Sequence, residues 1–521
     1  MPLLSLLSTN VPLRAGAILL AISIIFIAVL NRRRNSVAAR APLPPGPPGL
    51  PLVGNLLDVP RDQPWRAFRN LSKKYGDVVR VSVLGQTTVV LNSVAAASDL
   101  LDKRSSIYSS RPESIISISE MLGYEWVLPY MPYDHRWRRA RRLFWQYFQP
   151  SVVGQWHPSQ TLEARRLLRH LLEDQSDVDS TTNLSLTRSL MSTAYGLSAK
   201  DVGPSFVELL HDAEIGASEA FSPTVLTIPW LRRLPAWFPG GYWQRKLPYW
   251  KALAQKAISA PFEAAQDALD RGDAKHAMLS RLSDSLEGDE PEIKAALTKT
   301  LTATTFLAGT DTTSVTLQGF FCAMLLYPEV QKRAQEELDA VVGPDRLPQF
   351  ADRASLPYIT AVVKEVLRWH NVAPLGLPHS CTADDEYRGW RIPKGATVMA
   401  NVWGILHDPE HYPNPEAFNP DRFLKDGKLN EDVLDPGTVM YGFGRRACPG
   451  RYFADNSLFI NIASLLHVFN IMPAVDEQGA AIPVEYNVTS GLVLMIEPFK
   501  CSVRPRSKAA EALVRDGFDI E

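Results

Sequence analysis

Residues 441–450 read Tyr441-Gly442-Phe443-Gly444-Arg445-Arg446-Ala447-Cys448-Pro449-Gly450 and stand just before the apolar run 457–466. Glycine adopts positive φ and lets backbone approach a flat, bulky group closely. Arginine side chains and the free N–H groups at a helix start favour thiolate over thiol, and Pro449 suits a first helical turn. These are the requirements of an axial heme ligand, so the stretch predicts that Cys448 binds a metal. An ordinary glycine-rich loop with an inert cysteine is the alternative.

The composition excludes several classes of protein. The 521 residues carry a formal charge of −1, so bulk electrostatics give no support to a nucleic-acid partner. Hydrophobic residues make up 45% of the chain, which is normal for a globular protein with a sizeable core. The cysteines are Cys322, Cys381, Cys448 and Cys501, without a C-x-x-C pair. Neither a zinc site nor a disulfide framework is therefore predicted, and a reducing compartment fits best.

The N-terminus has the pattern of a membrane anchor. Residues 15–30 are apolar apart from Ser23, and the cluster Arg32–Arg34 follows them. As a helix this run is about 24 Å long, and residues 11–13 can extend it. A cleaved signal peptide is the alternative, but the positive charges follow the run and no small-residue cleavage site separates them. We predict a single anchor over residues 1–34, with everything beyond it in the cytosol.

The next segments predict a mostly α fold with a minor β region. The proline-dense stretch 41–49 is expected to be a stiff, extended spacer. Residues 77–92 alternate strand formers around Gly85-Gln86, which indicates a hairpin. Beyond it the pattern is mostly helical until residues 390–398. The Trp-, Leu- and Pro-rich segment 227–250 is either core or a part that dips into a membrane surface.

Three further patterns carry chemistry. The run 135–142 holds five arginines, and within it Trp137 and Arg141 share one helix face, although such a run is usually a solvated face. A long helical pattern over 289–327 contains 308–313, Ala-Gly-Thr-Asp-Thr-Thr, which is poor helix-interior sequence and indicates room for a ligand. Glu365 and Arg368 lie three apart on one predicted helix, where a surface ion pair is the plainer interpretation.

Together these patterns resemble the cytochrome P450 family over nearly the whole chain. Residues 441–450 are similar to its F-x-x-G-x-R-x-C-x-G signature, with Tyr441 where the family has Phe. Residues 308–312 match A-G-x-D/E-T, Glu365–Arg368 matches E-x-x-R, residues 420–423 match P-x-R-F, and 137–141 match W-x-x-x-R. The anchor and the proline-rich stretch resemble those of microsomal members. Residues 229–241 look similar to the fungal O-methylsterigmatocystin oxidoreductase-like group.

The resemblance implies a cytochrome P450 fold that binds heme b, with Cys448 as the axial thiolate. It implies that Asp311 and Thr312 are catalytic and form a proton relay, and that Glu365, Arg368 and Arg422 form a structural network. It implies a hinge at 35–54 and a catalytic domain at 55–521. The implied cofactor-binding residues are Cys448, Trp137, Arg141, His379, Arg446, Phe443, Gly442, Gly450 and Ala308, of which Trp137, Arg141 and His379 would meet the propionates.

The implied activity is that of a monooxygenase. It would insert one oxygen atom from O2 into a lipophilic small molecule, either a terpenoid or a polyketide-like metabolite. Electrons would come from a separate NADPH–cytochrome P450 reductase that docks on the arginines near Arg445 and Arg451, with cytochrome b5 as a second donor. The expected location is the endoplasmic reticulum membrane. A heme-thiolate isomerase or dehydratase and a non-catalytic heme-binding protein are the alternatives.

The substrate is expected in a pocket of mostly apolar residues. Its candidate walls are residues 114–121, 306–310, 372–377 and 489–492.

Overall fold

The computed structural model describes residues 41–59, 62–174, 178–197, 243–272, 277–286 and 288–516, together with residues 209, 212, 213, 216 and 237. The predicted anchor over residues 1–34 and most of the segment 227–250 lie outside these residues. Within the described part, no helix is both long and apolar enough to cross a membrane.

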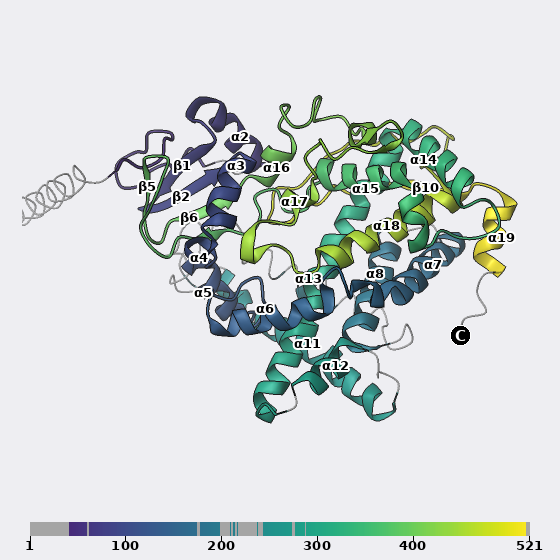
Figure 1. Ribbon diagram of the computed structural model, residues 1–521, viewed down its shortest axis with the longest axis horizontal. Coiled ribbons are helices and arrows are strands. Elements are labelled where there is room, and N and C mark those ends of the chain that lie inside the picture. Colours follow the sequence, from purple (N-terminus) through teal and green to yellow (C-terminus); the bar gives the residue numbers. More distant parts are fainter. Residues whose placement is uncertain are drawn as a thin grey trace, which may run out of the picture.

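Helices make up most of the molecule (Figure 1), as the sequence pattern predicts. The longer ones, in chain order, are α2 (Pro64–Tyr75), α5 (Glu113–Leu122), α6 (His135–Phe148), α7 (His157–Glu173), α8 (Val178–Tyr195), α11 (Trp243–Asp270), α12 (Met278–Ser285), α13 (Pro291–Leu326), α14 (Pro328–Val341), α15 (Pro357–Trp369), α18 (Arg451–Val468) and α19 (Lys508–Asp516). Four helices are short: α3 (Val94–Ala97), α4 (Ser105–Tyr108), α16 (Val402–Leu406) and α17 (Gly437–Met440).

The largest sheet has the order β1-β2-β6-β3, formed by β1 (Val78–Val83), β2 (Gln86–Leu91), β6 (Thr397–Ala400) and β3 (His379–Ser380). Three two-stranded pairs accompany it: β4 (Asp385–Tyr387) with β5 (Trp390–Ile392), β7 (Leu424–Lys425) with β8 (Lys428–Leu429), and β9 (Phe469–Pro473) with β10 (Cys501–Pro505). Strands β1, β2, β5 and β6 lie together at the left end of the molecule in Figure 1.

The predicted hairpin is confirmed as β1 and β2. Val78 pairs with Leu91 and Val83 with Gln86, so the turn consists of Leu84 and Gly85. Both turn residues have positive φ, 50° and 85°. Two such residues in a row form the tight turn whose twist matches that of the flanking strands.

The proline-rich stretch is extended, as expected, but it is also packed against the sheet. The Pro45 carbonyl accepts a hydrogen bond from the Arg80 backbone N–H of β1 at 2.8 Å, and the Pro42 carbonyl accepts one from Arg391 of β5 at 2.7 Å. A side chain at Gly46 would clash with the Arg80 carbonyl, only 1.9 Å from the Cβ position. The stretch is therefore a docked part of the fold and not a free-standing spacer.

Helix α13 organises the core. It crosses the middle of the molecule (Figure 1) and is buried along most of its 36 residues by α8, α12, α15 and α18. A helix surrounded in this way lacks an amphipathic stripe, which explains why apolar residues occur all round it. One apolar cluster joins α13 to α14, α15 and α18, and a second joins it to α6, α8, α11 and α12.

The predicted Glu365–Arg368–Arg422 network is confirmed as a set of contacts. Glu365 and Arg368 are 0% exposed, and the Arg368 guanidinium meets the Glu365 carboxylate with two hydrogen bonds of 2.7 and 2.8 Å. Arg422 adds a third at 3.1 Å. The network ties α15 to the segment 413–423, because both arginines also donate to backbone carbonyls there. The plainer alternative, a surface pair, is excluded.

Candidate active site

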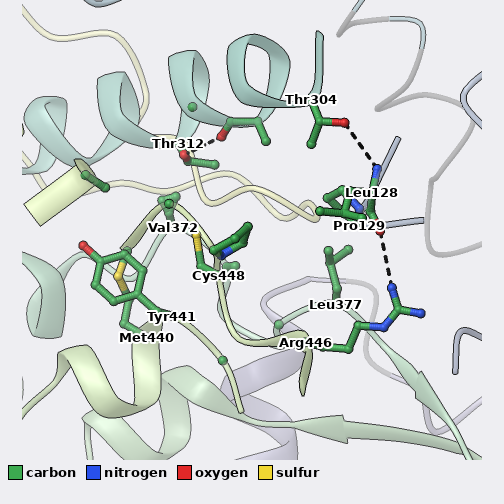
Figure 2. A pocket seen from close by; sticks show the side chains of 18 of the residues that line it. Leu128, Pro129, Thr304, Thr312, Val372, Leu377, Met440, Tyr441, Arg446 and Cys448 are labelled. Atoms are coloured by element: carbon green, nitrogen blue, oxygen red, sulfur yellow. Dashed lines mark hydrogen bonds between the residues drawn. The ribbon is translucent and has the colours of Figure 1, made fainter. Parts of the chain in front are cut away.

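The loop before α18 places Cys448 at the wall of an internal cavity (Figure 2). The Cys448 N–H donates to the Tyr441 carbonyl at 2.7 Å, which closes the loop on itself. Gly444 has φ of 58°, and a Cβ there would lie 2.0 Å from the Leu101 carbonyl oxygen, so glycine is required. Helix α18 begins at Arg451 with Gly450 as its N-cap. Pro449 therefore precedes the helix, and its predicted place in the first turn was wrong.

The electrostatics around Cys448 differ from the expectation. Burial raises the pKa of the thiol, and the Gly450 N–H, Arg141 and Arg451 lower it only in part. The arginines and the helix start thus act in the predicted direction, but desolvation outweighs them in the chain by itself. This direction describes the metal-free chain, in which nothing but the protein's own groups acts on the sulfur. Coordination to a metal deprotonates a thiol outright. A bound iron would therefore supply the stabilisation of the Cys448 thiolate that the protein groups alone do not provide.

The cavity lies between this loop and α13. It has a volume of about 300 Å³ and a mostly apolar lining. On the side of the loop it is lined by Gly442, Phe443, Cys448 and Gly450, and on the opposite side by Thr304, Ala308, Gly309, Thr312 and Thr316 of α13. Further walls come from Leu128 and Pro129, from most of the segment 372–377, and from residues of α6, α8 and α18. Residues predicted as functional in distant parts of the chain therefore line one and the same cavity.

Three arginines and a histidine gather at one edge of this cavity. Arg111 is 4% exposed, and Arg141, Arg446 and His379 also line the space. Burial is the main cause that lowers the pKa of Arg111 and Arg141 to about 10 and that of Arg446 to about 8. Burial likewise lowers the pKa of His379 to about 3, helped by Arg111 and Arg446. None of the described residues that line the cavity is a carboxylate.

This arrangement fits heme. The buried guanidiniums donate to backbone carbonyls, but no carboxylate among the lining residues balances their charge. Such a charge favours an anionic partner, and the two heme propionates are anions that arginine binds bidentately. The Cys448 sulfur lies in the same space, on the loop that also carries Arg446. His379 donates its Nδ1–H to the Tyr108 carbonyl at 2.6 Å, so its Nε2 can donate to a propionate only when the ring is protonated, a state that the negative charge of the propionate itself favours. Trp137 is buried beside Arg446, whose guanidinium lies 4.3 Å from the centre of the indole ring.

The two residues of the predicted proton relay differ in whether they line the cavity. Thr312 faces the cavity, and its hydroxyl donates to the Ala308 carbonyl at 2.9 Å (Figure 2). Asp311 directly precedes Thr312 on α13 but is not among the cavity-lining residues. Gly309 has an additional reason to be glycine, because a Cβ there would lie 2.9 Å from Leu190 of α8. Close packing of two helices thus accompanies the expected room for a ligand.

The predicted pocket walls are correct only in part. Most of the segment 372–377 lines the cavity, and so do Ala308 and Gly309, whereas Phe306 and Thr310 do not. Residues 114–121 and 489–492 are absent from the lining, which corrects both expectations. Sequence reasoning missed Arg111, Leu128, Pro129 and Thr304. The only signal for Arg111 is an arginine beside proline in an otherwise uncharged stretch, Ser109 to Pro112.

The other four arginines of α6 form two groups: one borders an open recess, and the other is engaged in ion pairs. Arg138 and Arg142 are exposed and border an open recess together with Arg445 and Arg451, which we call the basic recess. Trp145 lies in it, 5.3 Å below the Arg451 guanidinium. Arg136 and Arg139 instead pair with Asp134 and Asp289. The predicted grouping near Arg445 and Arg451 is thus confirmed for Arg138 and Arg142.

Comparisons with known proteins agree with this site. The family model described as Cytochrome P450 matches residues 44–503. The chain is 36% identical to Cytochrome P450 monooxygenase COX1 of Coprinopsis cinerea, over 96% of this chain and 99% of the relative. It is 40% identical to Cytochrome P450 monooxygenase COX2 of the same fungus and to Cytochrome P450 monooxygenase ple1 of Rhodocybe pseudopiperita, in both cases over 91% of each chain. With a cysteine loop, cations and a helix-lined cavity already arranged for heme, this chain belongs to the cytochrome P450 family and is a heme-thiolate monooxygenase.

Proposed function

We propose that this enzyme inserts one oxygen atom from O2 into a lipophilic terpenoid or polyketide-like molecule of secondary metabolism. The observation that carries the proposal is the cavity itself, in which Cys448 and Thr312 line opposite walls and the space between them is mostly apolar. Such a lining selects an apolar substrate by burial and excludes water from the reacting centre. The relatives support the reaction type, because each is named as a fungal cytochrome P450 monooxygenase.

The residues have separable tasks in this mechanism. Bound heme with its axial thiolate supplies the activation of O2 and the cleavage of the O–O bond. Cys448 holds the metal, while Arg111, Arg141, Arg446 and His379 hold the propionates. Trp137, Phe443, Gly442 and Gly450 shape the space for the flat group, and Ala308 leaves room above it. The presence of these residues in the lining of the cavity supports this assignment.

Thr312 and Asp311 handle protons. The Thr312 hydroxyl rests on the Ala308 carbonyl and reaches the cavity, so rotation about its side-chain bond turns the proton toward the reacting oxygen. Asp311, half-buried and outside the lining, exchanges protons between solvent and Thr312. A positioned proton donor of this kind accelerates reactions typically by about 10²–10⁴-fold. An isomerase or dehydratase has no use for such a relay, which favours oxygen insertion over those alternatives.

Electrons come from a separate NADPH–cytochrome P450 reductase, with cytochrome b5 as a second donor. The basic recess supports this docking of the reductase, because it is an open recess beside the Cys448 loop and is lined by arginines that would attract an acidic surface. We also propose that residues 1–34 anchor the chain in the endoplasmic reticulum membrane, with the hinge 35–54 leading to a cytosolic catalytic domain, 55–521. Trp237, 80% exposed within the segment 227–250, suits a second contact with the membrane.

The test uses the full chain in microsomes with reductase, NADPH and ¹⁸O2, supplied with a panel of fungal terpenoids and polyketides. We expect NADPH-dependent products that carry one ¹⁸O atom. The balance is substrate, O2, NADPH and a proton giving hydroxylated substrate, water and NADP⁺. A rearranged product that forms without NADPH would establish the isomerase instead. Heme binding without any product across the panel, when a known monooxygenase turns over in parallel, would favour the non-catalytic alternative.

A further inference from the structure

The segment that packs against the Cys448 loop contains a turn of π-helix. Residues Ser98–Lys103 form this element, η1, which directly continues the short helix α3. Hydrogen bonds in a π-helix span five residues instead of four, a rare arrangement that occurs mostly as a single turn and frequently at functional sites. Leu100 and Leu101 in the middle of η1 are buried, and Leu101 lines the cavity. A rare turn beside the cofactor cavity calls for a physical reason.

Two successive residues near the end of η1 contact Gly444 of the Cys448 loop. The Leu101 carbonyl oxygen would lie only 2.0 Å from a Cβ at Gly444, so the two backbones are in close contact. The Asp102 carboxylate accepts a hydrogen bond from the Gly444 N–H. A hydrogen bond to an ionised acceptor is stronger than one between neutral groups. η1 therefore fixes Gly444 in two ways, by backbone packing and by a charge-assisted hydrogen bond.

The position of Gly444 affects Cys448 through the backbone of the loop. Gly444 begins the tight turn η6 (Gly444–Arg446), and the Ala447 N–H closes this turn on the Gly444 carbonyl at 3.1 Å. The Cys448 N–H closes the wider loop on the Tyr441 carbonyl at 2.7 Å. Because Gly444 lies between the two ends of that loop, a displacement of its N–H moves the backbone that carries the sulfur.

The other contacts of η1 attach it to the hairpin formed by β4 and β5. Asp99 accepts a hydrogen bond from the Tyr387 hydroxyl at 2.8 Å. Arg104, directly after η1, donates to the Asp385 carboxylate at 2.8 Å. These contacts hold η1 in place independently of the loop. Two carboxylates of one helical element thus have different tasks, because Asp99 bonds the hairpin and Asp102 bonds the Cys448 loop.

We propose that Asp102 is a positioning residue that keeps the Cys448 sulfur where it binds iron as a thiolate. Asp102 is exposed and is not among the residues that line the cavity, so it acts through Gly444. When the sulfur leaves the metal, it keeps the electron pair of the broken bond and takes up a proton from water. The hydrogen bond from Gly444 opposes the loop movement that this exchange requires. The inference goes beyond the proposed function, because it concerns the ligand and neither the substrate nor the redox partner.

The test follows the thiolate band of the reduced carbon-monoxide complex in heme-loaded, full-length protein. The proteins are held in urea below the unfolding transition of each, and the rate at which the band disappears is measured beside the helix content. In Asp102→Ala we expect the band to disappear about three- to tenfold faster than in the wild type, the range that one net hydrogen bond provides. The helix content should stay unchanged over the same time, because the replaced side chain is exposed.

Two variants separate the hydrogen bond from a general loosening of η1. Asp102→Asn keeps an oxygen that can accept from Gly444, so its rate should return close to that of the wild type. Asp99→Ala removes a carboxylate from the same element but leaves the loop contact, and Arg104 still holds η1 to the hairpin. Its rate should therefore stay close to that of the wild type. If Asp102→Ala binds no heme, Asp102→Ser, whose oxygen is one bond closer to the backbone, is compared in its place.

Three results would overturn the proposal: a wild-type rate in the variant that lacks the Asp102 carboxylate, an equal acceleration in Asp99→Ala, or no recovery in Asp102→Asn. The measurements need neither reductase, NADPH nor substrate. A failure of the proposed reaction therefore leaves these rates intact, and equal rates leave the reaction intact, so the two failures are distinguishable.

Discussion

Replacing Glu365 by glutamine should strongly destabilise the folded protein and lower its heme content. Glu365 accepts four hydrogen bonds: two from Arg368, one from the Asn419 N–H at 2.7 Å and one from Arg422 at 3.1 Å. The change keeps the shape of the side chain, deletes its charge and replaces one acceptor oxygen by an NH2 group that cannot accept. It leaves the Arg368 guanidinium, which is 0% exposed, without a counter-charge.

The expected magnitude follows from this burial. Breaking a buried pair by removing one partner costs about 3–5 kcal/mol, because an uncompensated charge stays in the interior. Native domains are stable by only about 5–15 kcal/mol, so the loss takes up a large share of the total. Arg422→Ala should cost less than Glu365→Gln, because the Glu365–Arg368 pair survives it and Arg422 lies at the edge of the network, 7% exposed.

The assay measures heme per protein and the urea midpoint for Glu365→Gln, Arg422→Ala and a matched control. Glu511→Gln makes the same chemical change in the exposed pair with Arg515 on α19, 2.9 Å apart. Such a pair contributes only about 0.3–0.5 kcal/mol. We expect the order Glu365→Gln, Arg422→Ala, Glu511→Gln from most to least destabilised. If Glu365→Gln loses no more stability than Glu511→Gln, the reasoning about the buried network is wrong.

Four further predictions follow from the site and the chain ends. Cys448→Ser should abolish the thiolate band of the reduced carbon-monoxide complex, whereas Cys322→Ser, Cys381→Ser and Cys501→Ser should keep it; a normal band in Cys448→Ser refutes the ligand. Thr312→Ala should consume NADPH and O2 but release peroxide instead of product, while Asp311→Asn should turn over slowly with heme still bound; unchanged coupling in Thr312→Ala contradicts the relay. Burial lowers the pKa of His370 from 6.5 to about 4, so as pH drops the unfolded chain binds this proton first and the stability of the folded protein falls through that window. The decrease of the urea midpoint between pH 7 and 5 should therefore be smaller in His370→Gln than in the wild type, whereas the exposed control His411→Gln should keep the wild-type decrease. An equal decrease in all three proteins would speak against His370. Deleting residues 1–34 should release the protein from carbonate-washed membranes, and release of the full-length chain by carbonate contradicts the anchor.

Local patterns in the sequence were sufficient for the features that depend on neighbouring residues. The Cys448 loop, the β1–β2 hairpin and the long helix α13 follow from glycine positions, alternation and helical spacing, which act over a few residues. Trp137 and Arg141 share a helix face for the same reason. The resemblance to the family then connected these local features into one fold, and the family model and relatives confirm it.

Only the tertiary structure decided which polar groups meet around the cavity. Arg111 reaches the carbonyls of Leu377 and Pro378, 266 and 267 residues away, and Thr304 meets Leu128 across 176 residues. These contacts involve loops, whose sequences have no periodicity that predicts a partner. The net rise of the Cys448 pKa likewise depends on how many groups from distant segments exclude water from the sulfur. Burial is a property of contacts between such segments, so it becomes visible only when the chain is folded.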